Sequence, residues 1–391
     1  MINKKLLRRC PICGAAEGSI LYTQKFTVPD DFILPKEYDV VVCGNCGFSF
    51  ADTLSNQETY NKFYELQSKY ESKVTGSGGG YSDYDLKRLN DTADYIEHDL
   101  QLDKNASIAD IGCANGGLLK NLKNRGYKNL TGIDPSVICV QNVREQGIEC
   151  IKGSIFDIQN KTFDFCILSH VMEHIYNLQD AIFAVKKLLS ASGQLYIEVP
   201  NSSLYTDFYV VPFYYFDSEH INHFDNISLT NLGASAGLHA VHYGYKSIPV
   251  SNNVLYPAVF VVFDKISVTG TNYAELSLRN YINRSSQDSN IHSKISELIA
   301  DRKEICIWGV GNYTFRLLAT TDLAKCDIRY FVDSDSKKTG NGKTLMSKKI
   351  VSPQALKDFK GTVVISSALY ARDIEKQVNA INPELKTVLL A

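Results

Sequence analysis

The stretch between Phe216 and Asp225 concentrates side chains that can do chemistry. It reads FDSEHINHFD and contains Glu219, His220 and His223 close together. Imidazole and carboxylate groups bind metal ions, and they also move protons near neutral pH. The stretch therefore allows three interpretations: a metal site, a proton-transfer site, or polar residues on a surface loop.

The position of this stretch along the chain favours proton transfer. His220 and His223 are three residues apart and would converge on one ion in a helix, but the apolar residues around them offer no further ligand. The stretch follows a predicted strand at residues 193–200, GQLYIEVP. Ligands bind at the carboxyl ends of parallel strands, so a His placed there beside a carboxylate is suited to act as a general base.

Four of the ten cysteines are grouped in two pairs near the N-terminus. The motifs CPICG and CGNCG contain Cys10, Cys13, Cys43 and Cys46, and each motif ends in Gly. A two-residue gap lets both thiolates of a pair face one ion, and four thiolates satisfy the tetrahedral preference of zinc. We predict a closed, structural zinc site; a redox pair or four free thiols are the alternatives. The other six cysteines are expected to be small buried hydrophobic residues.

The bulk composition is that of a globular protein with several domains. A length of 391 residues predicts two or three domains, and 44% hydrophobic with 21% charged residues is ordinary for a soluble chain. A net charge of -2 argues against a nucleic-acid partner held by a broad basic surface. The sequence contains neither the apolar core of a signal peptide nor a run of roughly 20 apolar residues for a membrane span. We expect a cytoplasmic protein with no membrane partner, of unknown oligomeric state.

The predicted elements alternate between strands and helices. Residues 71–80, ESKVTGSGGG, are expected to form a linker or loop, and a helical pattern begins at Tyr84. Strand and helix signals then alternate, which predicts a parallel sheet with helices on both faces. Further helices are expected near residues 273–282 and 293–300, and a second alternation over the last segment predicts a smaller α/β unit.

A glycine-containing turn follows the first strand of the larger alternation. The motif ADIGCANGG has Asp110 at the end of the strand and small residues at alternate positions, namely Gly112, Ala114 and Gly116. Small residues let the backbone and a ligand approach closely at this edge of a sheet. Asp134 follows the next strand and is placed to accept hydrogen bonds from ribose hydroxyls. The spacing differs from the G-x-G-x-x-G of dinucleotide-binding domains, which remain the alternative.

Over residues 85–240, this series of landmarks resembles the class I S-adenosylmethionine-dependent methyltransferases. In that family the glycine loop and its preceding acid hold the methionine part, the acid after the second strand holds the ribose, and the loop after the third strand holds the adenine. The resemblance implies the following cofactor-binding residues: Asp110, Gly112, Cys113, Ala114, Gly116, Asp134, Ser154, Ile155 and His170. Ala114 replaces the usual middle Gly, and Ser154 stands where an Asp is common.

The order of segments along nearly the whole chain resembles the zinc-containing, three-domain sugar C-methyltransferases of deoxysugar biosynthesis. There the His of a Glu-His pair removes the proton next to the keto group of a nucleotide-linked sugar, and the enolate takes the methyl group. The resemblance implies that His220 is the base, with Glu219 beside it and His174 in the same active site. It also implies a Tyr from the start of the domain, for which Tyr81 and Tyr70 are both candidates.

Three domains follow from this resemblance. They are a zinc-binding lobe over residues 1–75, a methyltransferase domain over 76–240, and a Rossmann-like α/β domain over 241–391. In the last of these domains, Gly309 and Gly311 precede a helix, which is typical of a degenerate nucleotide-binding fold. Such a domain either binds a ligand or has only a structural role, packing against the rest of the protein.

Two other functions remain open. An O- or N-methyltransferase acting on a sugar or another small molecule would also use a basic His. A non-catalytic binding protein, with the zinc lobe as a docking module, is the third candidate. Asn222 and His223 have no role in any of these interpretations.

Overall fold

The computed structural model describes residues 2–66, 78–251, 254–264, 281–282, 284–286, 289–339 and 342–390. Tyr70, most of the expected linker at 71–80 and nearly all of the expected helix at 273–282 lie outside these residues. The chain divides into two compact units. Unit 1 comprises residues 1–21, 40–208 and 219–278, and unit 2 comprises residues 22–39, 209–218 and 279–391.

The strands and helices have the following bounds. The strands are β1 Ile2–Lys5, β2 Glu17–Lys25, β3 Glu37–Cys43, β4 Ser49–Asp52, β5 Ser107–Ile111, β6 Asn129–Asp134, β7 Glu149–Lys152, β8 Phe163–Ser169, β9 Leu189–Pro200, β10 Asn222–His223, β11 His239–Ser251, β12 Val254–Asp264, β13 Ile305–Trp308, β14 Ile328–Val332, β15 Thr344–Leu345, β16 Lys348–Val351, β17 Thr362–Ile365 and β18 Lys386–Leu389. The α-helices are α1 Gln57–Leu66, α2 Asp83–Asp94, α3 Gly117–Asn124, α4 Val137–Glu145, α5 Leu178–Leu188, α6 Asn226–Ser235, α8 Asn290–Asp301, α9 Asn312–Thr320 and α10 Ala371–Ile381. Short helical segments are η2 Tyr95–Asp99, η3 Met172–His174, η4 Ser202–Leu204, η5 Asp322–Lys325 and η6 Pro353–Asp358.

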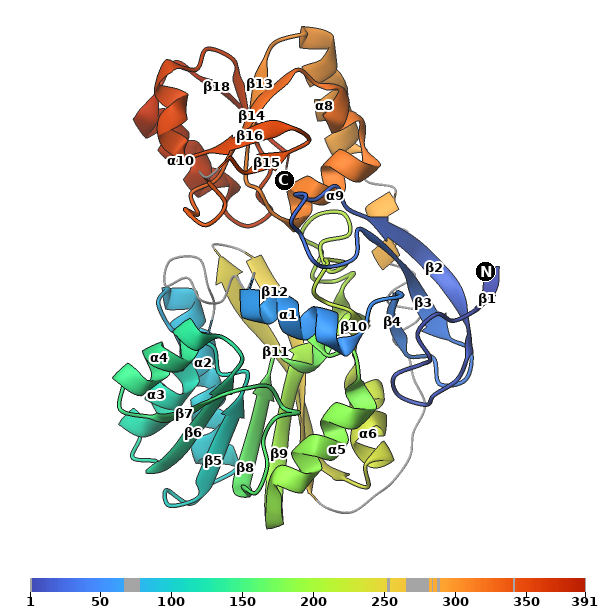
Figure 1. The fold of residues 1–391 in the computed structure, drawn as a ribbon, viewed down its shortest axis with the longest axis vertical. Coiled ribbons are helices and arrows are strands. Elements are labelled where there is room, and N and C mark those ends of the chain that lie inside the picture. The colour runs from blue at the N-terminus through green and yellow to red at the C-terminus, as the bar shows by residue number, and fades with distance from the viewer. Residues whose placement is uncertain are drawn as a thin grey trace. The chain divides into compact units, whose positions relative to one another are not determined.

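A seven-stranded sheet is the centre of unit 1 (Figure 1). Its order is β11-β12-β9-β8-β5-β6-β7, and the five strands from β9 to β7 are parallel. β12 runs antiparallel to both of its neighbours. The predicted parallel α/β sheet is therefore confirmed. The sheet also includes β11 and β12, so it continues beyond residue 240, where the sequence places the domain boundary.

Hydrophobic residues cover both faces of this sheet because side chains alternate along each strand. On β5, Ile108 packs with residues of α2, α3 and α4, whereas its neighbour Ala109 packs with residues of α5 and α6. The residues from α2 to α6 thus form two cores, and the loops at the carboxyl ends of the parallel strands lie along one edge.

The paired cysteines lie beside a second, five-stranded sheet of order β1-β2-β3-β4-β10. Its last strand comes from far along the chain: Asn222 pairs with Phe50 and His223 with Ser49. Directly afterwards, α6 begins with a reciprocal capping box in which Asp225 accepts from the Ser228 N–H at 2.8 Å. The stretch from 219 to 225 is therefore fixed by β10 and by the start of α6.

Unit 2 contains a six-stranded sheet of order β15-β16-β14-β13-β17-β18. The pairs from β16 to β18 are parallel, and β15 is an antiparallel edge strand. A core including Trp308, Val363 and Val378 packs α10 onto this sheet. The predicted second α/β alternation and the helix expected near residues 293–300, which is α8, are confirmed. No helix of the described residues is long and apolar enough to cross a membrane.

Candidate active site

The glycine loop after β5 adopts a conformation that its small residues permit. Gly112 and Gly116 have φ angles of +77° and +76°, in the left-handed region. A Cβ on Gly112 would lie 2.6 Å from Cγ2 of Val171, so a larger residue would clash there. Ala114 takes a φ of +46° despite its side chain. The loop is thus built for close approach at the carboxyl end of β5.

Asp110 is a buried carboxyl directly before this loop. Its pKa is raised to about 7, mainly by burial; the charge of Arg88 opposes the rise and the charge of Asp134 adds to it. A carboxyl of this kind is partly protonated at neutral pH and becomes a stable anion when a cation arrives.

Asp134, at the end of β6, holds the glycine loop. One carboxylate oxygen accepts from the Ala114 N–H at 2.9 Å, and the other accepts from the Ser136 N–H at 2.9 Å. A carboxylate oxygen has a second lone pair, so these bonds leave acceptor capacity for a ribose hydroxyl. The predicted ribose contact of Asp134 stays a prediction.

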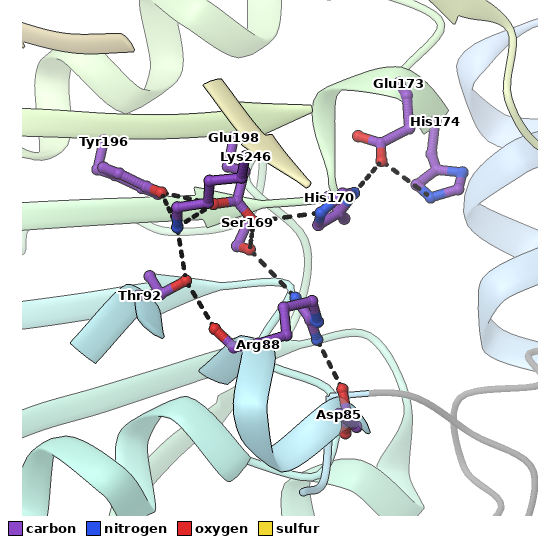
Figure 2. Close-up of polar contacts among 10 residues, drawn as sticks. All are labelled: Asp85, Arg88, Thr92, Ser169, His170, Glu173, His174, Tyr196, Glu198 and Lys246. Carbon is purple, nitrogen blue, oxygen red and sulfur yellow. Dashed lines mark hydrogen bonds and ion pairs between the residues drawn. The ribbon is translucent and has the colours of Figure 1, made fainter. Parts of the chain in front are cut away.

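Residues before and on α2 contact the start of the helix that follows the glycine loop, and Figure 2 shows the part of this network formed by Asp85, Arg88 and Ser169. Asp85 accepts from the N–H groups of Gly78 and Gly80 at 2.9 and 2.7 Å, and the Gly78 carbonyl accepts from the Gly117 N–H at 2.8 Å. Arg88 pairs with Asp85 at 2.9 Å and reaches Ser169 at the end of β8. Residues 78–88 are therefore fastened to the edge of the sheet where the cofactor is expected.

Two predicted cofactor residues turn out to have other contacts. The side chain of Cys113 is buried, with its sulfur 3.9 Å from that of Cys150 and 3.7 Å from the Ala114 carbonyl oxygen. Ser154 donates to Asp157 through both its N–H and its hydroxyl, at 2.7 and 2.6 Å. Ile155 is buried beneath this turn. The assignments of these residues to the cofactor remain predictions.

Four polar side chains meet beside η3. The Tyr64 hydroxyl lies 2.8 Å from Nδ1 of His174 and 3.5 Å from Oε2 of Glu219. The His174 and His220 rings lie 4.8 Å apart, centre to centre. Glu219 and His174 are buried and His220 is half-buried. The arrangement brings together His174, Glu219 and His220, as the sequence predicts.

Tyr64, on α1, occupies the place for which the sequence offered Tyr81 and Tyr70. Tyr81 is 46% exposed, and its electrostatic neighbours are Cys139 and Glu145 rather than the histidines. The structure therefore places Tyr64, and not Tyr81, beside His174 and Glu219. The one sequence signal for Tyr64 is the pattern TYNKFYEL of α1, in which Tyr60 and Phe63 are buried and so leave Tyr64 on the flank of that face.

A buried chain of charges leads from this group toward β9 (Figure 2). The His170 ring lies between Glu173 and Glu198, at 3.2 Å from each. Burial lowers the pKa of His170, but the hydrogen bonds to these two carboxylates outweigh it and raise the pKa. Lys246 lies 2.5 Å from Glu198 and holds the pKa of that buried carboxyl well below its usual range, against the effect of burial. Nδ1 of His170 is thus hydrogen-bonded to Glu173, whereas Nε2 is at ion-pair distance from Glu198 but makes no well-aligned hydrogen bond.

Asn222 gains a structural role that the sequence left open. Its side-chain amide donates to the carbonyls of Met172 and Ile175, at 2.8 and 2.7 Å, and so clamps the turn that carries Glu173 and His174.

His223 is fully buried with its Nδ1 3.4 Å from the Tyr205 hydroxyl. Consequently, His220 and His223 do not converge on one point.

A different set could hold a metal ion at this place. Glu173, His174 and His220 each offer one donor atom within 4.8 Å of the others. The Glu173 oxygen nearest to His174 is already bonded to His170, which reduces its value as a ligand.

The four paired cysteines form the second candidate metal site. The sulfur atoms of Cys10, Cys13, Cys43 and Cys46 all lie within 4.8 Å of one another. Cys10 and Cys46 are 3.6 Å apart, and Cys13 and Cys43 are 3.5 Å apart. A tetrahedral zinc site with bonds of about 2.3 Å places its sulfurs about 3.8 Å apart, so this set fits zinc.

Comparison with known proteins identifies the central domain. Residues 84–243 match the methyltransferase domain family, and residues 301–389 match the family described as C2185-like, N-terminal. No curated protein matches the chain in sequence.

Several solved structures resemble part of the chain. An S-adenosylmethionine-dependent methyltransferase from Thermotoga maritima is 16% identical over 46% of this chain and 91% of its own, with a TM-score of 0.37. The 1,6-didemethyltoxoflavin-N1-methyltransferase of Burkholderia thailandensis, bound to S-adenosylhomocysteine, is 15% identical over 57% and 97%, with a TM-score of 0.40. A methyltransferase from Methanosarcina mazei is 17% identical over 44% and 98%, with a TM-score of 0.38.

The domain match, together with the glycine loop at the end of β5, defines a class I methyltransferase domain. The chain is therefore an S-adenosylmethionine-dependent methyltransferase. Its methyl donor is S-adenosylmethionine.

Proposed function

We propose that this enzyme methylates a carbon atom next to the keto group of a nucleotide-linked sugar. The observation that supports this proposal best is the group formed by Tyr64, His174, Glu219 and His220. Carbon becomes nucleophilic only after a proton next to a carbonyl is lost, so a base must lie within hydrogen-bond reach of that proton. His220 is the proposed base.

The neighbours of His220 supply the other requirements of this reaction. The developing enolate oxygen needs a hydrogen-bond donor, which His174 or Tyr64 supplies. The carboxylate of Glu219, 3.5 Å from the Tyr64 hydroxyl, places a negative charge beside the two histidines. Methyl transfer then depends on alignment of the enolate carbon with the sulfonium, which the loops at the edge of the sheet provide when the cofactor is bound.

Solvent deuterium exchange tests the proposal directly. A panel of nucleotide-linked keto sugars is incubated with the enzyme and S-adenosylhomocysteine in deuterated water. We expect deuterium at one carbon next to the keto group, because the base removes and returns that proton without methyl transfer. No exchange in any sugar, with a methyl ether formed in the presence of S-adenosylmethionine, would instead establish an O-methyltransferase.

We also propose that Cys10, Cys13, Cys43 and Cys46 hold a structural zinc ion in an N-terminal lobe, followed by the methyltransferase domain and a C-terminal α/β domain. Four thiolates would close the coordination sphere, so the ion would stabilise the lobe and take no part in methyl transfer. Metal analysis of the purified protein should give one zinc per chain.

Substitution of Tyr64 should separate the two candidate tyrosines. In Tyr64→Phe the hydroxyl that contacts His174 and Glu219 is lost, and we expect kcat to fall about 10- to 100-fold. The affinity for S-adenosylhomocysteine should not change. Tyr81→Phe is the matched control and should keep full activity; a loss in that variant alone would restore Tyr81 to the site.

Cofactor binding should release a proton at Asp110. The resemblance places the methionine part of the cofactor beside this carboxyl, and its ammonium group, which S-adenosylhomocysteine also carries, favours the anionic form of Asp110. Because the pKa of free Asp110 is about 7, affinity for S-adenosylhomocysteine should rise with pH up to about 8 and then level off. Calorimetry at pH 6, 7 and 8 in two buffers measures both effects. Asp110→Asn should bind more weakly with no such rise; the same pH dependence in that variant would exclude Asp110 as the source.

A further inference from the structure

His170 takes a backbone conformation that residues other than glycine seldom adopt. It follows β8 and has a φ of +58°, in the left-handed region. Its N–H donates to the Glu198 carbonyl at 2.8 Å, so this turn is held against β9. Such conformations persist only where the surrounding contacts enforce them, and they gather at functional sites. The conformation therefore suggests a role for His170 beyond the connection of β8 to η3.

The His170 ring belongs to a row of four charges of alternating sign (Figure 2). Lys246 pairs with Glu198, and the ring lies 3.2 Å from a carboxylate oxygen of both Glu198 and Glu173. Both glutamates are fully buried, and the Lys246 side chain is only 15% exposed. Because buried ion pairs add little net stability over apolar residues of the same volume, such a row is better explained by a need for charge at its end.

The end of the row away from η3 is fixed by hydroxyl groups. Lys246 donates to the hydroxyls of Tyr196 and Thr92, each at 2.9 Å. Glu198 accepts from the Tyr196 hydroxyl at 2.6 Å and from the Ser169 hydroxyl at 3.2 Å. These bonds come from α2, β8 and β9. Glu198 is therefore a rigidly held anion against which the His170 ring is placed.

Glu173 is the end of the row that faces the candidate active site. Burial raises its pKa, but the hydrogen bond to His170 and the charges of the nearby histidines outweigh this effect and lower it. Its Oε1 lies 3.2 Å from Nδ1 of His170 and 4.0 Å from Nε2 of His174. Its Oε2 has no hydrogen-bond partner among the described residues. The cation that balances this buried carboxylate most directly is thus the His170 ring.

His174 lies between Glu173 and a backbone carbonyl. Its Nδ1 is 3.1 Å from the Glu219 carbonyl oxygen, which can only accept, so Nδ1 carries a proton in this bond. Its Nε2 then faces the carboxylate of Glu173. A nearby anion orients an imidazole and favours its positive form, and a charged donor binds a developing oxyanion more strongly than a neutral one. The strength of His174 as a donor therefore depends on Glu173.

The turn that begins at His170 also contacts the glycine loop. The next residue, Val171, packs on Gly112, since a Cβ on that glycine would lie 2.6 Å from Cγ2 of Val171. Within five residues the chain thus passes from the cofactor loop to Glu173 and His174. A single ring at the start of this turn can align the two.

We propose that His170 is a positioning residue for methyl transfer, and that its imidazolium sets the orientation and the charge of the His174 ring through Glu173. The inference rests on the proposed function, because there His174 supplies the hydrogen bond to the enolate oxygen. It gives the His170 ring a task within the protein in place of a contact with the cofactor. Glu198 and Lys246 hold that ring in place.

His170→Gly removes the ring but permits the same left-handed backbone. Turnover should fall about 100-fold, because a displacement of about 1 Å at His174 misaligns the donor. The affinity for S-adenosylhomocysteine should not change. Added imidazole, which is partly protonated at neutral pH, should restore turnover, whereas pyrazole has the same size, stays neutral and should not. The matched control is His98→Ala, a histidine whose side chain is 70% exposed, and neither compound should alter its turnover.

A spectroscopic measurement separates this inference from the proposed function. Protein with isotope-labelled histidines, saturated with S-adenosylhomocysteine, gives ring signals from eight histidines, and comparison with His174→Gln identifies that of His174. In His170→Gly this signal should shift, and it should return with imidazole but not with pyrazole. The measurement needs no methyl acceptor, so its result stands even if no keto sugar reacts.

Glu198→Gln is the second variant, in which the carboxylate that holds the ring loses its charge but keeps its shape. Turnover should fall, and the double variant with His170→Gly should fall no further than His170→Gly alone, since Glu198 acts through that ring. Binding of S-adenosylhomocysteine confirms that Glu198→Gln is folded. The proposal is overturned by an unmoved His174 signal, by equal rescue with pyrazole, or by additive losses in the double variant. Weaker binding of S-adenosylhomocysteine to His170→Gly, unaffected by imidazole, would also overturn it and return the ring to the cofactor site.

Discussion

His220→Ala is expected to reduce turnover by about 10³-fold or more, because the variant lacks the base that generates the nucleophile. S-adenosylhomocysteine should bind as in the wild type, since the residues assigned to the cofactor, His170 after β8 excepted, lie at the ends of β5, β6 and β7 or in the loops that follow. Deuterium exchange into the sugar should disappear together with methyl transfer. Turnover, exchange and calorimetry, measured on the same preparation, give all three results.

The controls for this variant separate the base from its neighbours. His98→Ala replaces a histidine whose side chain is 70% exposed and should behave like the wild type. His174→Gln should retain some exchange, because it weakens the stabilisation of the enolate but leaves the base in place. Undiminished exchange in His220→Ala would remove His220 from the role of base, and loss of exchange in His174→Gln alone would transfer that role to His174.

Loss of Cys13, one of the proposed zinc ligands, is expected to reduce turnover substantially even though this residue lies outside the group that contains His220. In Cys13→Ser we expect no bound zinc, a lower melting temperature and turnover reduced by about 100-fold. The reason is that β4, in the lobe, pairs with β10, whose first residue comes two positions after His220. In addition, the Ala51 N–H donates to the Ile221 carbonyl at 2.9 Å. The lobe thus holds the backbone that carries the base.

Cys326→Ser provides the matched control, since Cys326 lies in unit 2 and outside the four-cysteine group. It should retain zinc and full activity. Cofactor affinity should survive in Cys13→Ser, because the cofactor loops belong to the seven-stranded sheet. Normal turnover in zinc-free protein would show that the lobe does not position His220.

Much of the fold can be predicted from the sequence because its signals are local. The small residues Gly112 and Gly116 indicate a turn with left-handed backbone angles. Asp110 lies beside this turn because it is at the end of the strand that leads into it. The two Cys-x-x-Cys pairs likewise predict a cluster from spacing alone. His174, Glu219 and His220 were predicted to share a site; the structure places them close together, and their catalytic roles stay a prediction.

Other parts of the site depend on contacts between distant segments. Tyr64 reaches His174 from α1, and neither residue type nor spacing distinguishes it from the many other tyrosines of the chain. Asn222 clamps the turn at η3 through its side-chain amide, a role that becomes visible only when both segments are placed. Similarly, the end of the central sheet was missed because β11 and β12 pair back onto β9 in antiparallel fashion.

The pairing of β4 with β10 also has a consequence for synthesis on the ribosome. Residues 49–52 emerge early, but their partners at 222–223 are translated only after most of the methyltransferase sheet. During that interval the edge of β4 lacks a neighbour, and exposed strand edges recruit other chains. Zinc captured early by the four cysteines would hold the nascent lobe together until β10, the fifth strand of its sheet, is made.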